Sequence, residues 1–212
     1  MQSTTHTQYR WGRVAAQAIS LLFHPLTMAL WLAVMVMYGY ASPLKFPFSL
    51  RYFVLGNVVI CTLVIPYIFR LLLRLFGIVR RDGRDGRRVR VMCLIIWVLC
   101  YVCCGVIFAE VPLLFLLRKM LFLGAIVLLL ALVAEFLAPL CWHTLSYGAM
   151  MGYMWVLLFV GNVGLLYPFI LFLVCGGLLI TARLYLSELP TRRIYCSLLL
   201  GVAIAILGAV FV

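Results

Sequence analysis

The chain has 212 residues, of which 67% are hydrophobic and 10% are charged, with a mean hydropathy of +1.22. A water-soluble domain of this size cannot bury so many apolar side chains, so lipid must be the main solvent. The net charge of +12 lies in short segments between apolar runs, where an anionic lipid or a phosphorylated ligand is a closer match than nucleic acid.

The apolar runs are about 20 residues long and lack period-two alternation, which favours helices over a β-barrel. The fold class predicted is therefore all-α, a polytopic transmembrane bundle of about six to seven helices. The first run follows the polar stretch 1–13 and is longer than a signal-peptide core, so we interpret it as a retained helix. No linker or repeat divides the chain, which predicts a single integral membrane domain over residues 1–212. The predicted spans are 15–39, 52–76, 91–110, 119–140, 145–162, 165–183 and 194–212.

The parity of seven spans places the N-terminus and the regions 77–90, 141–144 and 184–193 on one side of the membrane. Thirteen Lys and Arg residues then lie on that side and four on the other, which the positive-inside rule assigns to the cytoplasm and the outside, respectively. The thirteen are residues 10, 13, 70, 74, 80, 81, 84, 87, 88, 90, 183, 192 and 193, and the four are residues 45, 51, 118 and 119.

The densest charged feature is the segment 80–90, which holds six arginines in eleven residues at a predicted membrane surface. Guanidinium groups bind phosphate bidentately and stay charged, so the cluster suits a phosphorylated headgroup. The alternative is a topology anchor that touches anionic lipid. The candidate phosphate ligands are Arg81 and Arg88, with Arg84 and Arg87 as secondary candidates.

Two further residues, His143 and Arg183, are expected on the same side. His143 lies where the fourth span meets the fifth, and a neutral imidazole there can act as an acid or base. Arg183 ends the sixth span, where a charge is costly without a partner or ligand. Glu135 is the candidate partner. The alternative for His143 is a hydrogen-bonded surface histidine.

His24 lies roughly ten residues into the first span, near mid-bilayer by this count, and precedes Pro25. A kink with a buried hydrogen bond is favoured over a proton relay. The eight cysteines are scattered through apolar runs, and Cys100, Cys103 and Cys104 share one predicted helix without histidine partners. We therefore interpret the cysteines as packing residues and expect neither a metal nor a cofactor.

The ordered set of an arginine-rich loop, a histidine before a small-residue helix, and an Ala-Arg-x-Tyr-Leu segment resembles the type 2 phosphatidic acid phosphatase superfamily. The likeness is closest to a divergent bacterial membrane branch, which also carries a Phe-His-Pro-Leu segment in its first helix, as at Phe23 to Leu26 here. The resemblance implies a phosphorylated lipid as ligand and the bacterial inner (cytoplasmic) membrane as location. It implies no particular protein partner.

The first family motif is Lys, six residues, then Arg-Pro, and Arg81 and Arg88 have this spacing, with Val89 in place of proline. The second motif, Pro-Ser-Gly-His, keeps only His143, which in the family protonates the leaving oxygen. By this resemblance Arg81, Arg88 and His143 are retained site residues.

The third family motif is Ser-Arg, five residues, His, three residues, Asp. Here Arg183 keeps the phosphate-binding position, whereas Leu189 occupies the nucleophile position and Arg193 the aspartate position. Leucine can neither attack phosphorus nor accept a proton. The leading hypothesis is thus a phosphatase-like protein that binds a lipid phosphate without normal turnover. The alternatives are an active lipid phosphatase with a non-standard nucleophile and a structural subunit of a membrane complex.

Overall fold

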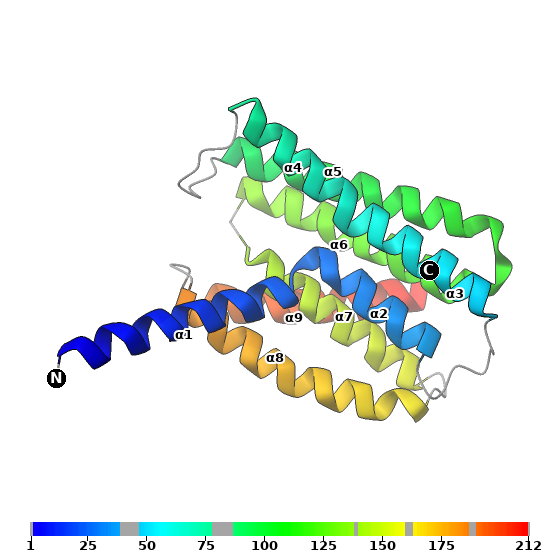
Figure 1. Cartoon of the computed structure of the whole chain (residues 1–212). Helices are drawn as coiled ribbons and strands as arrows, with labels where there is room; N and C mark the ends of the chain where they lie inside the picture. Colours follow the sequence, from blue (N-terminus) through cyan, green and yellow to red (C-terminus); the bar gives the residue numbers. More distant parts are fainter. Residues whose placement is uncertain are drawn as a thin grey trace.

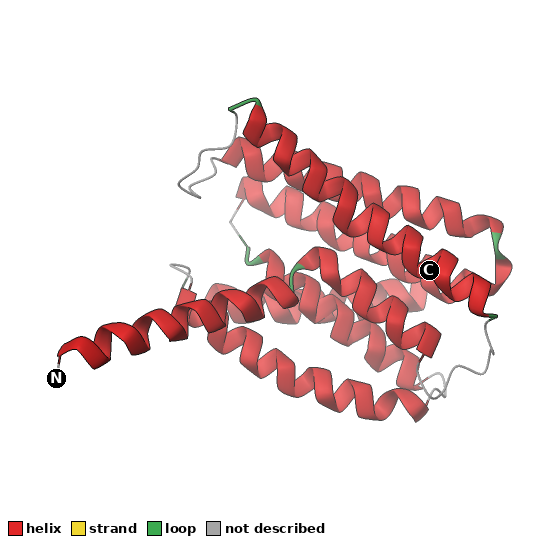
Figure 2. Ribbon diagram, in the orientation of Figure 1, coloured by secondary structure: helices red, strands yellow, loops and turns green. Residues whose placement is uncertain are grey.

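The computed structural model describes residues 2–38, 47–77, 87–137, 140–159, 163–186 and 190–211, and these residues contain no strand. The all-α prediction is confirmed (Figure 2). The helices are α1 (Gln2–Leu22), α2 (Pro25–Tyr38), α3 (Phe48–Val59), α4 (Ile65–Leu75), α5 (Arg87–Ile107), α6 (Phe115–Leu137), α7 (Trp142–Phe159), α8 (Leu166–Leu186) and α9 (Thr191–Phe211).

From α2 onward the helices run back and forth along the bundle (Figure 1). As a result α4, α6 and α8 end at the same end of the bundle at which α5, α7 and α9 begin; we call this the arginine end. One connected cluster of buried apolar side chains draws on α2 and on every later helix through α9. The alternating directions agree with the parity used to place the polar regions.

The described residues of the seven predicted spans lie mostly in helices, but the spans are not equally apolar. Five helical stretches are long and apolar enough to cross a membrane, namely Phe48–Leu75, Arg87–Glu110, Phe115–Phe136, Leu166–Leu186 and Thr191–Ala209, and the bent pair of α1 and α2 makes a sixth. The chain is therefore an integral membrane protein. Of the seven predicted spans, the one that is not among these six is α7. This helix contacts α2, α6, α8 and α9. A helix covered by other helices needs less apolar surface than one that faces lipid.

The first predicted span is broken. α1 and α2 meet at Phe23 and His24 with a bend of 59°. Pro25 has no N–H to continue the helical ladder, and its ring disfavours a helical conformation at His24. Thr27 Oγ1 donates to the carbonyls of Leu22 and His24, at 2.7 Å each, so side-chain donors satisfy carbonyl groups at the break. The kink expected at Pro25 is confirmed.

The second predicted span contains a π-helical turn, Ile60–Val64, between α3 and α4. The cause is Pro66, which cannot donate to a carbonyl in the preceding turn. The backbone widens there, and the Ile65 N–H bonds to the Ile60 carbonyl. The helix thus continues to the arginine end, where Arg70 and Arg74 lie on α4.

The closest helix pair is α7 with α9. A Cβ atom built on Gly201 would lie 2.1 Å from the Leu145 carbonyl oxygen, and one on Gly148 would lie 2.2 Å from the Leu198 carbonyl oxygen. Only glycine permits this approach, as in other membrane helix pairs with small residues at the interface. The contact fixes the start of α7, and with it His143, against α9.

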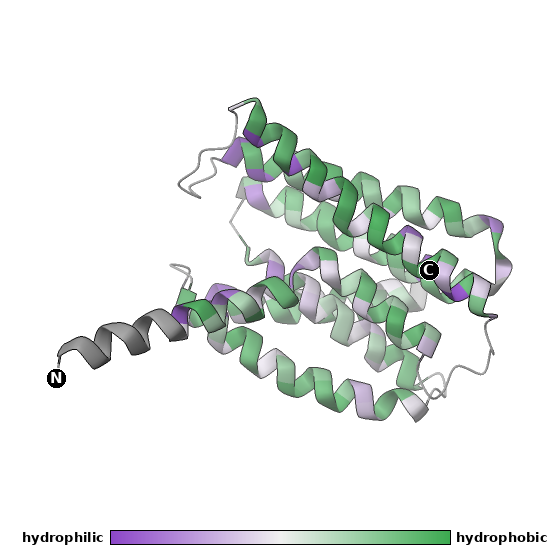
Figure 3. Cartoon of the chain, viewed as in Figure 1, coloured by the Kyte–Doolittle hydropathy of each residue, from purple (hydrophilic) through white to green (hydrophobic). Residues whose placement is uncertain are grey.

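Charged residues gather at the two ends of the bundle, and apolar residues cover the ribbons between them (Figure 3). The described cations at the arginine end include Arg13, Arg70, Arg74, Arg87, Arg88, Arg90, Arg183, Arg192 and Arg193, and those near the opposite end are Arg51, Arg118 and Lys119. The described helices therefore keep the predicted segregation of charge.

Candidate functional site

A polar cleft of about 360 Å³ lies where α1, α7 and α8 meet near the arginine end. We call it the headgroup cleft. Its described lining includes two arginines, two histidines, a serine and a glutamine, and no acidic residue. The lining residues are Arg13, Gln17, Ser20, Leu21, His24, His143, Arg183 and Leu186.

Arg183 lies one turn before the end of α8, on the side that packs against α1. Its Nη1 atom donates to Ser20 Oγ at 3.2 Å, and Ser20 is itself buried. Its Nε atom is buried and has no hydrogen-bond partner among the described residues. The guanidinium is thus positioned by its bond to Ser20 and keeps one buried donor without a partner among the described residues.

His143 lies in the first turn of α7 and is 8% exposed. Ser197 on α9 holds this helix start, because its Oγ accepts from the Cys141 N–H at 3.1 Å. Thr144 Oγ1 donates to the Cys141 carbonyl at 3.0 Å. His143 Nδ1 is buried and has no hydrogen-bond partner in the described part of the chain. The prediction that His143 and Arg183 lie at one site agrees with this cleft.

His24 enters the same cleft from the break between α1 and α2. Its ring meets the His143 ring edge to face, with centroids 5.1 Å apart and an interplanar angle of 90°. It also packs edge to face on Trp97 of α5, at 5.2 Å between centroids. His24 therefore lies beside the first turn of α7, at the break between α1 and α2 and not within one straight helix.

The charge balance of the headgroup cleft suits an anion. Two guanidinium groups face it without an acidic residue among the described lining residues, and the imidazoles add nitrogen donors or acceptors. Planar guanidinium forks match the oxygen pairs of phosphate. The start of α7 adds the positive end of a helix dipole. The arrangement can bind and orient a phosphate group.

The other predicted site residues lie elsewhere or outside the described residues. Arg88 is exposed at the start of α5 and does not line the cleft. Arg87 stacks over the Phe136 ring at 4.6 Å. The residues Arg81, Arg84 and Leu189 lie outside the described part of the chain. Of the four predicted principal site residues, the cleft contains His143 and Arg183.

Glu135 is not the partner of Arg183. Its carboxylate accepts hydrogen bonds from Arg90, with both Nε and Nη2 of the arginine 2.7 Å from Oε1. The pair joins the end of α6 to the start of α5 and lies outside the headgroup cleft. The predicted pairing is wrong because α6 delivers Glu135 to its neighbour α5, and Arg183 packs against α1 instead.

Sequence reasoning missed four members of the cleft: Arg13, Gln17, Ser20 and His24. The spacing of residues 13, 17, 20 and 24 repeats every three or four positions, which is the signal of one helix face. This signal was hard to recognise because the polar residues at 13 and 17 lie close to the predicted start of the first span, where polar residues are common. Only the packing of α1 on α8 brings that face to Arg183.

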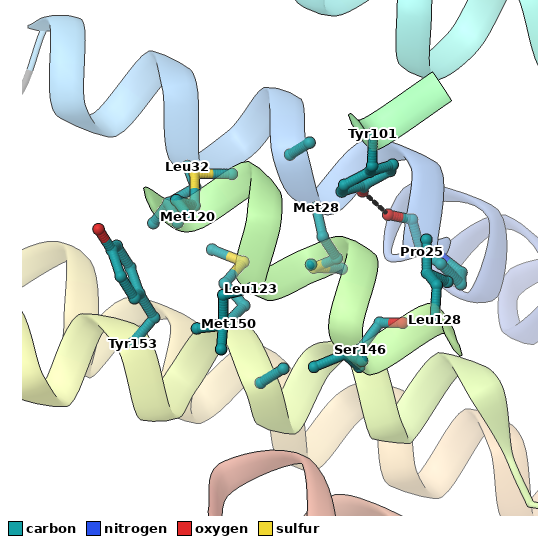
Figure 4. Close-up of a pocket in the computed structure, with 14 residues that line it drawn as sticks. Pro25, Met28, Leu32, Tyr101, Met120, Leu123, Leu128, Ser146, Met150 and Tyr153 are labelled. Atoms are coloured by element: carbon teal, nitrogen blue, oxygen red, sulfur yellow. Dashed lines mark hydrogen bonds between the residues drawn. The ribbon is translucent and has the colours of Figure 1, made fainter. Parts of the chain in front are cut away.

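Two other cavities adjoin this region. A small one of about 50 Å³ lies between α2, α6 and α7, below the bond from Tyr101 Oη to the Pro25 carbonyl at 2.8 Å (Figure 4). It is lined by methionines and leucines, with Ser146 and two tyrosines. A larger one of about 560 Å³ lies between α2, α4 and α5. The larger cavity shares Leu21 and His24 with the headgroup cleft.

No group of three or more His, Cys, Asp or Glu side chains converges among the described residues. Comparisons of the chain with protein-family models, with curated proteins and with solved structures found no match.

Proposed function

We propose that this integral membrane protein binds the phosphate of a phosphorylated lipid in the headgroup cleft and does not turn it over by the mechanism of the phosphatases it resembles. Arg183 supplies the main charge, His143 and Arg13 flank it, and the membrane is the bacterial inner (cytoplasmic) membrane.

One observation carries this proposal: Arg183 and His143 line the same cleft, and each has a buried nitrogen, Arg183 Nε and His143 Nδ1, without a hydrogen-bond partner among the described residues. A buried polar atom without a partner costs roughly 1 to 3 kcal/mol. A phosphate oxygen accepts from the guanidinium, and a phosphate hydroxyl or an ordered water can bond the imidazole. Binding of the anion would satisfy groups that the fold leaves unsatisfied.

The absence of normal turnover rests on the nucleophile. The resemblance puts Leu189 at the position of the attacking histidine, and His24 does not replace it in this arrangement. His24 Nδ1 accepts from the Leu26 N–H at 3.3 Å, so a neutral ring carries its proton on Nε2. A protonated nitrogen has no lone pair with which to attack phosphorus. His24 is therefore a donor and not a nucleophile.

The binding test uses the purified chain in phosphatidylcholine nanodiscs, with and without phosphatidic acid. Arg183→Gln should weaken phosphatidic acid binding at least tenfold, because a charge-assisted hydrogen bond contributes about 1.5 to 3 kcal/mol. The matched control is Arg192→Gln, which removes the same charge from an exposed site at the same end of the bundle. Equal losses in both variants would indicate general attraction to anionic lipid, as expected of a structural subunit with anchoring arginines.

The turnover test measures phosphate release from phosphatidic acid and from a polyprenyl diphosphate. We expect no release above that of a His143→Ala variant. Substantial release that disappears in His143→Ala would overturn the no-turnover part of the proposal and favour an active lipid phosphatase with a non-standard nucleophile.

A further inference from the structure

The 560 Å³ cavity beside the headgroup cleft has a lining of a different kind. Most of it is apolar and comes from the break between α1 and α2, from α4 with its preceding π-turn, and from α5. We call it the chain cavity. Its lining residues are Leu21, His24, Leu26, Thr27, Leu63, Val64, Pro66, Tyr67, Arg70, Leu71, Arg74, Cys93 and Trp97.

We propose that the chain cavity holds the hydrocarbon chain of the lipid whose phosphate binds in the headgroup cleft, and that His24 contacts the headgroup where the two spaces meet. This inference rests on the proposed function, because it assigns the rest of the same ligand. It predicts an amphiphile with a compact anionic head and at least one long apolar chain.

The shared lining of the two spaces is the first argument. His24 and Leu21 line both, so the headgroup cleft and the chain cavity lie against the same break between α1 and α2. The headgroup cleft is rich in cations, whereas the chain cavity is lined mostly by apolar side chains. Transfer of a hydrocarbon chain from the bilayer into such an apolar space costs little free energy, because both surroundings are apolar. The anionic head meanwhile forms charge-assisted hydrogen bonds with the arginines.

The cations of the chain cavity give the second argument. Arg70 and Arg74 are one turn apart on α4, in the half of that helix nearest the arginine end. Arginine places its apolar stem along a hydrophobic surface and its charged head at the polar boundary. Both arginines therefore mark the polar edge of the chain cavity, which orients a lipid with its anionic head toward the arginine end.

His24 is suited to the junction because the helix break fixes its ring. The Leu26 N–H occupies Nδ1, so the neutral ring offers Nε2–H as a donor. Edge-to-face contacts with Trp97 and His143 hold the ring from two sides. A fixed N–H donor between an arginine cleft and an apolar cavity matches the oxygen-rich junction of a phospholipid head and its chains.

The first experiment fills the chain cavity. Leu71 lines it and is 46% exposed, whereas the next residue, Leu72, does not line it and is 43% exposed, so the two substitutions are matched. Leu71→Trp should weaken binding of dioleoyl phosphatidic acid at least fivefold and leave glycerol 3-phosphate binding unchanged. Leu72→Trp should change neither. Wild-type affinity of Leu71→Trp for dioleoyl phosphatidic acid would overturn the assignment of the chain.

The second experiment addresses His24 with a pair of nearly isosteric variants. His24→Asn and His24→Asp both keep a side-chain oxygen that can accept from the Leu26 N–H and so preserve the start of α2. Only the aspartate repels an anion. Phosphatidic acid should bind His24→Asp at least tenfold more weakly than His24→Asn, and equal affinities would place the headgroup away from His24.

The two experiments separate this inference from the proposed function. If wild-type protein binds neither phosphatidic acid nor glycerol 3-phosphate, the proposed function fails. If binding depends on Arg183 but not on the volume at Leu71 or on the charge at residue 24, the proposed function stands and the chain assignment is wrong.

Discussion

The rings of His24 and His143 stand edge to face at 5.1 Å between centroids, although they lie on helices far apart in the sequence. The contact requires the bend of 59° at Pro25, which turns α1 away from the line of α2. It also requires the close approach of α7 and α9, which fixes the first turn of α7. The geometry of the headgroup cleft therefore depends on a helix break and a helix interface.

Thr27 stabilises the break, because its hydroxyl bonds to the carbonyls of Leu22 and His24. Thr27→Val should lower the free energy of unfolding by about 1 to 2 kcal/mol, since the Leu22 carbonyl at the break accepts from the side chains of Thr27 and Trp31 and loses one of these donors. Thr181→Val is the control, because its hydroxyl bonds to the Leu178 carbonyl inside the continuous α8 helix. Unfolding in an SDS titration measures both, and equal losses would contradict a special role for the break.

Gly201 should be intolerant of substitution. A methyl group there would lie 2.1 Å from the Leu145 carbonyl oxygen, so Gly201→Ala must push α9 away from α7. We expect a loss of more than about 2 kcal/mol in the same titration. Gly177→Ala on α8 is the control: its Cβ meets nothing within 4 Å, and alanine favours a helix, so stability should be unchanged or higher. A stable Gly201→Ala would refute the close interface.

Arg90 and Glu135 should respond unequally to substitution. The Glu135 side chain is 8% exposed and the Arg90 side chain 40%. Arg90→Met leaves a carboxylate buried without this partner and should cost about 3 kcal/mol, whereas Glu135→Gln leaves a cation that reaches solvent and should cost less. The double variant should recover part of the Arg90→Met loss. Additive losses in thermal unfolding would argue against the pair as a stabilising contact.

The topology of α7 can be tested with reporters. Five helices, α5 to α9, lie between Gly77 and the C-terminus and alternate in direction. If each crosses the membrane, a reporter inserted after Gly77 and one fused after Val212 report opposite faces. Reporters on the same face would show that α7, which is not among the helices apolar enough to cross a membrane, does not cross.

Much of the fold could be predicted because lipid leaves the backbone few choices. Each long apolar run must form a helix to satisfy its own hydrogen bonds, and the described residues of the seven predicted spans lie mostly in helices. Proline positions also predicted local geometry, since Pro25 produces the expected kink. The number of lipid-facing spans was harder to predict, because hydropathy does not distinguish a helix that faces lipid from one that is covered by its neighbours.

The site could be predicted only in part. Arg183 was a candidate because a charge at a span end is costly without a partner or ligand, and His143 because a neutral imidazole there can act as an acid or base; both line the headgroup cleft. Arg88 was a candidate by spacing and lies outside it. Spacing along the chain predicts which residues share a helix face, but it does not predict which neighbouring helix that face meets.

By itself the sequence determined that the protein is a helical membrane bundle with most of its arginines at one end, because desolvation of the backbone and of charges dictates both features. Only the tertiary structure decided that His24 meets His143, that Arg183 bonds to Ser20, and that Glu135 pairs with Arg90. These contacts depend on the bend at Pro25 and on helix packing, which are cooperative properties of the whole bundle and have no signature in any one segment.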